Sequence, residues 1–180
     1  MAKFYEQLTP ALTEFLEAQH VYFVASATAD SRINLSPKGL DTLRVIDEKT
    51  VRYLDLTGSG NETAAHLVHD GRLTLMTCAF VGKPKILRLY GRGRVINRSS
   101  PEWNDAIAAF PDYDNARQVI ELAIETLQTS CGFGVPNLVH QSDRDEMVQW
   151  SERKGPEGVR KYWRDRNAES IDGLEAPSPE

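Results

Sequence analysis

The order of apolar and polar positions predicts a chain built mostly from short strands, with helices near both ends. After Thr9-Pro10, which suits a helix start, apolar residues repeat at helical spacing. A second helix is expected from about Asn61 to His69. Runs rich in strand-forming residues precede and follow it, at residues 21–28, 32–36, 44–47, 51–57, 72–80 and 85–97. Because most connections between these runs are short, they favour antiparallel pairing.

About six short strands interrupted by one helix predict a closed or partly closed antiparallel β-barrel, since closure removes the unpaired edges of a sheet. The fold class expected is therefore mainly β with added helices. From Pro101 onward the pattern changes to helical spacing. Residues 116–127 predict a solid helix, and residues 142–153 and 158–167 predict two polar, amphipathic helices.

This pattern divides the chain into three parts. Residues 1–100 are expected to form the barrel core with its N-terminal helix. Residues 101–175 are expected to form a helical extension packed on the barrel. Residues 176–180, Ala-Pro-Ser-Pro-Glu, are expected to form a flexible tail.

Composition narrows the function classes. The net charge of −5 argues against general affinity for nucleic acid. No apolar run approaches the roughly 20 residues that span a bilayer, and the first residues lack the apolar segment of a signal peptide. We therefore expect a cytoplasmic protein that binds neither nucleic acid nor membrane.

A metal site is not expected. Cys78 and Cys131 lie far apart and lack metal-ligand spacing, which favours structural roles for both. His66 and His69 share one face of the predicted helix, but no third ligand accompanies them.

The most informative segment is Gly58-Ser59-Gly60, which joins a strand to the second helix. Small residues and the free N–H groups of a helix start suit a phosphate group. Ser36 and Lys38, at the end of another predicted strand, add a hydroxyl and an ammonium group. The alternative is purely structural, because Ser59 and Glu62 have the spacing of a capping box.

A second polar pattern lies in the last predicted strand. Arg88, Arg92 and Arg94 alternate with apolar or small residues and therefore share one face. Guanidinium groups in this arrangement suit a phosphate or a flavin carbonyl. They equally suit a solvated or subunit-facing surface where acidic residues pair with them.

The segments 34–39, 57–63 and 86–91, in this order along the chain, resemble the pyridoxamine 5′-phosphate oxidase-related family. The resemblance covers roughly residues 20–97. It implies a split β-barrel that binds FMN, in most members as a homodimer with the flavin between the subunits.

The resemblance also implies roles for particular residues. Lys38 matches a lysine that faces the cofactor, Thr57 a threonine near the flavin, and Arg88 an arginine of the later strand. Asn61, Glu62 and Thr63 fall where the family's oxidase has Ser-Arg-Lys for the FMN phosphate. With that basic pair replaced, phosphate binding is expected to use Asn61, Thr63, Lys38, backbone N–H groups and Ser36. Glu62 is expected to turn back to the Ser59 N–H group.

The resemblance to the oxidase weakens near the C-terminal end. No segment around residues 160–166 matches the part of the oxidase that holds pyridoxal phosphate, which argues against that activity. The leading hypothesis is an FMN-dependent oxidoreductase with an unassigned small-molecule substrate, an electron donor such as NAD(P)H, and no assignable catalytic residue. The alternatives are a non-catalytic flavin- or haem-binding carrier or sensor and a deazaflavin-dependent reductase. Trp150 and Trp163 suit either flavin shielding or packing.

Overall fold

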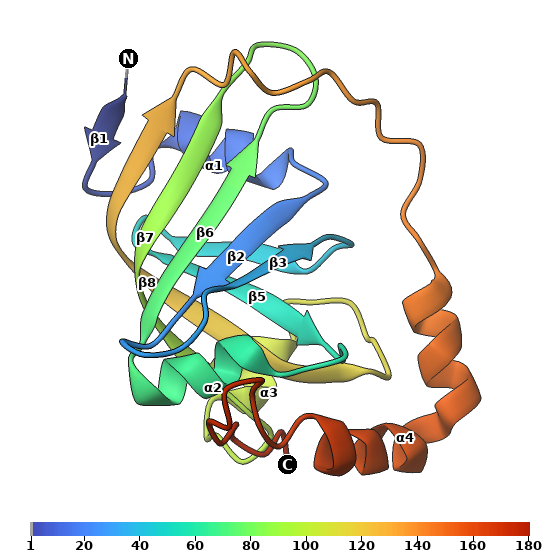
Figure 1. Ribbon diagram of the computed structural model, residues 1–180. Helices are drawn as coiled ribbons and strands as arrows, with labels where there is room; N and C mark the ends of the chain where they lie inside the picture. Colours follow the sequence, from blue (N-terminus) through green and yellow to red (C-terminus); the bar gives the residue numbers. More distant parts are fainter. Residues whose placement is uncertain (1) are drawn as a thin grey trace.

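Eight antiparallel strands form one strongly twisted sheet in the computed structural model, which describes residues 2–180 (Figure 1). Along the sheet the order is β3-β2-β6-β7-β8-β5-β4, and the short strand β1 pairs with β8. The path ends at β3 and β4, so the barrel is only partly closed. The strands are β1 (Lys3–Tyr5), β2 (Tyr22–Ser26), β3 (Asn34–Lys38), β4 (Leu43–Asp47), β5 (Thr50–Leu56), β6 (Arg72–Cys78), β7 (Ile86–Ile96) and β8 (Ala116–Ser130).

Four helices accompany the sheet: α1 (Pro10–Glu17), α2 (Glu62–His69), α3 (Trp103–Ile107) and α4 (Glu146–Arg166). The six predicted strands and the first two predicted helices are confirmed. Among residues 2–180, no helix is long and apolar enough to cross a membrane.

The predicted helix at residues 116–127 is wrong, because this segment lies within β8, the longest strand of the sheet. β8 pairs with β5 on one side and β7 on the other. Its first five residues are all buried, and the adjacent Val119 and Ile120 point to opposite faces, so both faces are covered there. A strand buried on both faces loses the two-residue alternation that identifies a strand in sequence. The C-terminal extension expected at residues 101–175 is therefore helical only in part.

The core of the barrel lies inside the twist of this sheet. Leucine and valine side chains from β2, β6, β7 and β8 meet α1 there and are almost inaccessible to solvent, including Leu16, Val24, Leu75, Leu89 and Leu127. A second cluster packs α3 against β5 and β8 through Trp103, Phe110 and Val119. Burial of this apolar surface is the main stabilising contribution to the fold.

One glycine sets how closely β7 and β8 approach. The register between them shifts at Tyr90 and Gly91. A Cβ atom on Gly91 would lie 1.9 Å from the carbonyl oxygen of Ala123. The irregularity therefore depends on the absence of a side chain at this position.

The two predicted C-terminal helices are confirmed as the halves of α4, which is broken at Gly155. This glycine has a φ of 66° and a ψ of 166°, outside the helical region, and Pro156 follows it. The second half is anchored on the barrel by the buried side chains of Val159 and Trp163. The first half stands away from the sheet (Figure 1).

The last residues differ from the flexible tail expected. The N–H group of Arg98 donates to the carbonyl oxygen of Pro179 at 3.2 Å, and the Asn97 amide donates to Ser178 at 3.0 Å. Pro179 is buried. These contacts hold the tail against the turn that follows β7.

Candidate functional site

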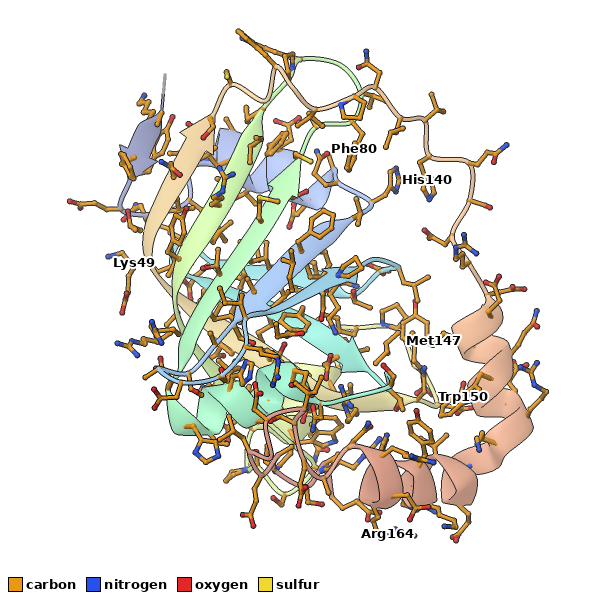
Figure 2. The ribbon with its side chains drawn as sticks, in the orientation of Figure 1. Lys49, Phe80, His140, Met147, Trp150 and Arg164 are labelled. Carbon is orange, nitrogen blue, oxygen red and sulfur yellow. The ribbon has the colours of Figure 1, made fainter. Side chains whose placement is uncertain are left out.

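A cleft of about 1460 Å³ lies between edge strand β3, the loop from β5 to α2, and α4. One wall of the cleft comes from the sheet and the loop. Its other wall comes from α4, with Met147 and Trp150 on the helix half that stands away from the barrel (Figure 2). The barrel end, called the polar end below, holds Ser36, Lys38 and Thr63, whereas the α4 end combines Met147, Trp150 and Tyr162 with charged side chains.

Four of the six predicted cofactor-binding residues line this cleft: Ser36, Lys38, Thr57 and Thr63. Asn61 lies behind the lining, only 2% exposed, where its Oδ1 accepts a hydrogen bond from Gln118 at 2.8 Å. Arg88 lies elsewhere, because β7 is separated from β3 by β6 and β2. Its guanidinium donates to Ser130 at 3.4 Å.

A buried carboxylate organises the polar end of the cleft. Asp55, on β5, is 2% exposed and accepts hydrogen bonds from Lys38 at 2.7 Å and from Arg117 at 2.7 Å. Gln118 donates to the same carboxylate at 2.8 Å. Burial raises the pKa of Asp55, but the charges of Arg117 and Lys38 outweigh burial and hold that pKa well below its usual range. Asp55 is therefore ionised at neutral pH.

Arg117 is the site residue that sequence analysis missed. It lies on β8, within the segment expected to be helical, and its side chain is 3% exposed. Besides Asp55, it donates to the Gly60 carbonyl oxygen at 2.9 Å and to the Asn167 Oδ1 at 2.7 Å. On β8, Arg117 precedes Gln118, the register partner of Asp55, and the register shifts between Asp55 and Leu56.

The Gly58-Ser59-Gly60 loop is held by the C-terminal end of α4. The Trp163 indole donates to the Thr57 hydroxyl at 2.7 Å, and that hydroxyl donates to the Asn115 carbonyl oxygen at 2.9 Å. The Asn167 amide donates to the Gly58 carbonyl oxygen at 3.3 Å. Trp163 therefore serves packing and loop positioning, and it does not line the cleft.

The capping box predicted for Ser59 and Glu62 is wrong. Helix α2 begins at Glu62, and its N-cap residue is Asn61, whose side chain makes no capping hydrogen bond. The Glu62 carboxylate instead accepts the N–H group of Ile171 at 3.0 Å. Since Ile171 lies more than 100 residues further along the chain, sequence spacing could not indicate this partner.

Ile171 belongs to a short C-terminal hairpin, residues 169–175, which lies against the start of α2. A second contact holds the same hairpin, because Asp172 forms an ion pair with Arg32 of the β2–β3 loop. The hairpin thus covers the side of α2 where Glu62 points. The backbone N–H groups of residues 59–64 have no acceptor among residues 2–180.

The cleft carries no surplus of charge. Its lining contains four basic and four acidic side chains: Arg32, Lys38, Arg117 and Arg144, and Asp55, Glu62, Asp143 and Glu146. Each has a charged or hydrogen-bonded partner within the chain; Arg144 pairs with Glu146 at 3.4 Å and Asp143 with His140 at 3.0 Å. An anionic ligand would therefore compete with existing partners.

The exposed arginines on β7 pair with acidic residues on the protein surface, as the alternative interpretation of this strand predicts. Arg94 pairs with Glu121 at 2.7 Å and also with Glu102, and Arg92 lies 3.6 Å from Glu125. Neither arginine lines the cleft. As ion pairs of exposed arginines, these contacts contribute little to stability.

The fold and the polar cleft at its strand–helix junction define a split-barrel protein, and comparison with known proteins identifies the family. The family model for pyridoxamine 5′-phosphate oxidase matches residues 8–131. The chain belongs to this family. It is 43% identical over 148 residues to a pyridoxamine 5′-phosphate oxidase family protein, ustO, from Aspergillus flavus. That match covers 77% of this chain but only 57% of the relative's length.

Solved structures agree on the fold. A putative pyridoxamine 5′-phosphate oxidase from Lactobacillus delbrueckii matches with a TM-score of 0.55 and 22% identity, over 68% of this chain and 94% of that one. HupZ from Group A Streptococcus matches with a TM-score of 0.54 and 16% identity, over 73% and 100%. More distant matches, with TM-scores of 0.49 and 0.47, are named as a FAD binding protein from Mycobacterium smegmatis and a heme storage protein from Vibrio cholerae. Similarity at these levels shows nothing about the ligand of this chain.

Proposed function

We propose that this chain is an FMN-binding oxidoreductase and that the flavin lies in the cleft between β3, the β5–α2 loop and α4. The observation that carries the proposal is that groups suited to a phosphate gather at the barrel end of the cleft: Lys38, Ser36, Thr63 and the N–H groups of the Gly58-Ser59-Gly60 loop. FMN suits this end, since its phosphate would meet these donors and its ring would lie along apolar side chains that line the same end, such as Leu35 and Leu40. Ligand pockets of proteins typically measure about 300–1000 Å³, so a cleft of this size has room for a flavin.

The residues present fit the FMN phosphate, with fewer cations than the family's oxidase has there. Lys38, whose side chain is 21% exposed, reaches the polar end of the cleft. Ser36 and Thr63 bring hydroxyl groups, and the N–H groups of residues 59–64 have no other acceptor in the described chain. The hydroxyl and N–H groups supply neutral donors and Lys38 supplies a positive charge among them, while Arg32, which also lines the cleft, is paired with Asp172.

The flavin, when bound, would supply the redox chemistry, and the chain supplies position and surroundings. Asp55 fixes Lys38 and Arg117, and Arg117 and Trp163 together fix the Gly58-Ser59-Gly60 loop. The first half of α4 forms the wall that limits access of water to the cleft. An electron donor such as NAD(P)H remains part of the proposal.

We further propose a homodimer that completes this site. Among residues 2–180, edge strand β3 has no strand partner on its outer side, and the apolar side chains of Leu35 on it and of Ile33 just before it are 63% and 78% exposed. Both residues also line the cleft. A second copy of the chain would cover this apolar edge and close the cleft on that side.

Oxidation of pyridoxamine 5′-phosphate itself is not proposed. That substrate needs a second phosphate-binding group beside the flavin. All four basic side chains that line the cleft already have acidic partners. The name of the relative from Aspergillus flavus states its family and no particular substrate, and this chain spans only 57% of its length.

The absorbance spectrum of the purified protein tests the proposal directly. We expect a yellow protein whose absorbance shows bound flavin and which releases FMN on denaturation. Reduction of that flavin by NAD(P)H, followed by reoxidation, would support an oxidoreductase. A colourless protein that gains no thermal stability from added FMN would overturn the proposal. In the same assay, stabilisation by haem or by a deazaflavin instead of FMN would favour the carrier or the deazaflavin-dependent reductase.

A further inference from the structure

The break in α4 brings two aromatic rings together at the cleft. In a continuous helix, residues 12 positions apart lie about 18 Å apart along the axis. In this structure the rings of Trp150 and Tyr162 lie 5.2 Å apart between centroids, at an interplanar angle of 79°. The backbone turns between them at Gly155, whose φ of 66° is one that residues with side chains rarely adopt. The kink therefore builds an aromatic corner from the two halves of α4.

This corner, consisting of Trp150 and Tyr162, lines the cleft and is only partly covered by the chain. Met147, which is 38% exposed, lies one turn before Trp150 on the same wall (Figure 2). Behind the corner, the Lys154 ammonium lies 5.7 Å from the Trp150 ring centroid and 5.9 Å from that of Tyr162. The neighbouring Trp163 is 4% exposed, so the chain buries one aromatic side chain here and leaves the other two facing the cleft.

The size of the cleft leaves room for a second ligand. At about 1460 Å³, it exceeds the roughly 1000 Å³ at the upper end of ordinary single-ligand pockets. The donors suited to a phosphate group are concentrated at the barrel end, around Lys38 and the loop. A flavin anchored there would leave the α4 end of the cleft accessible to another molecule.

The charges near the corner argue that this second ligand is neutral. Arg144 and Glu146 pair with each other, and Asp143 pairs with His140. These are the charged side chains that α4 and the segment before it contribute to the lining. No cation or anion among these lining side chains is unpaired, and the Lys154 ammonium lies against the two rings outside the lining, so the wall offers mainly aromatic surface to a ligand.

We propose that the aromatic corner binds the substrate and that this substrate is a neutral, planar aromatic molecule without a phosphate group. Calling this molecule the substrate rests on the proposed function, in which the flavin occupies the barrel end of the cleft. Binding of an aromatic molecule to the corner does not depend on the flavin. The two can therefore be measured separately on the same protein.

The test uses three probes with closely related ring systems: 2-naphthol, its phosphate monoester, and the saturated alcohol 2-decalol. Dissociation constants are measured by equilibrium dialysis on the protein as purified and after addition of FMN. We expect 2-naphthol to bind tightest, with the other two at least about tenfold weaker, because one adds an unmatched charge and the other lacks a π face.

Substitutions at the corner complete the test. Trp150→Ala should weaken 2-naphthol binding about three- to tenfold, the range expected for loss of an aromatic pair, and Trp150→Phe should retain most of it. Arg153→Ala, an exposed position on the same helix that does not line the cleft, is the matched control and should change nothing. Thermal melts verify that each variant folds. If Trp150→Ala does not fold, the order of the three dissociation constants on the unsubstituted protein tests the inference.

The inference is overturned if the phosphate monoester binds as tightly as 2-naphthol, or if folded Trp150→Ala binds 2-naphthol like the unsubstituted protein. If the proposed function is wrong, the protein instead fails to bind FMN, whether or not 2-naphthol is bound.

Discussion

Arg117 and Asp55 form an ion pair of 2.7 Å in which both side chains are 3% exposed, directly beneath the loop that joins β5 to α2. The pair lies on neighbouring strands, and Arg117 extends past it to the Gly60 carbonyl oxygen and to Asn167 at the end of α4. One buried cation thus links the sheet, the loop and the C-terminal helix. The position of the candidate phosphate site depends on this link.

Loss of the Asp55 charge should destabilise the protein. Asp55→Asn leaves Arg117 buried without its counter-ion and Lys38 with a weaker partner, and we expect a loss of about 3–5 kcal/mol in the free energy of unfolding. Urea unfolding measures this value. Asp41→Asn is the matched control, because the Asp41 side chain is 63% exposed in its pair with Arg44, and its effect should stay below about 1 kcal/mol. Equal effects of the two substitutions would show that the buried pair has no special role.

The same pair predicts a pH dependence. The pKa of Asp55 lies lower in the folded protein than in the unfolded chain, so its contribution to stability is complete above the unfolded pKa and is lost as the pH falls toward the folded pKa. The stability difference between the unsubstituted protein and Asp55→Asn should stay constant from pH 8 to about pH 5. Below about pH 4 it should narrow by about 1.4 kcal/mol per pH unit. A difference that instead narrows between pH 8 and pH 6 would contradict this assignment.

Much of the barrel could be predicted from the sequence, because β2 to β7 are short segments with strand-forming residues and clear turns between them. Strand β8 could not, since burial on both faces gives it apolar residues at helical spacing. That error concealed Arg117. Ser36 and Lys38 were singled out from a local motif, and Thr57 and Thr63 from the family resemblance; all four line the cleft. The bond from Glu62 to Ile171, in contrast, depends on distant chain segments that no local spacing indicates.

Glu62 is expected to hold the C-terminal hairpin and to oppose an anion at the start of α2. In Glu62→Ala, loss of the hydrogen bond to Ile171, about 1 kcal/mol, should open the hairpin roughly fivefold more often. Cleavage after Glu169 and Glu175 by a glutamate-specific protease measures this opening. FMN should bind the variant at least as tightly as the unsubstituted protein, because a negative charge has been removed. Weaker FMN binding would mean that the hairpin supports the site.

Gly91 should tolerate no side chain. In Gly91→Ala the new Cβ atom would lie 1.9 Å from a backbone oxygen of β8, so one of the two central strands must move. We expect a loss of about 3 kcal/mol or more in the free energy of unfolding, measured by thermal or urea unfolding. Gly134→Ala, where nothing lies within 4 Å of the new atom, should change stability by less than about 0.5 kcal/mol. A fully stable Gly91→Ala protein would contradict the β7–β8 register.

The central claim is that the polar end of the cleft holds the phosphate of FMN, and Lys38 tests it most directly. Flavin-free protein is titrated with FMN and with riboflavin, which lacks the phosphate, and quenching of flavin fluorescence is followed. Lys38→Ala should weaken FMN binding by about 1–3 kcal/mol, the range for a charge-assisted hydrogen bond, and leave riboflavin binding nearly unchanged. Lys49→Ala, in the turn between β4 and β5 away from the cleft, should alter neither (Figure 2). Equal weakening of FMN and riboflavin, or no saturable FMN binding in the unsubstituted protein, would contradict the account.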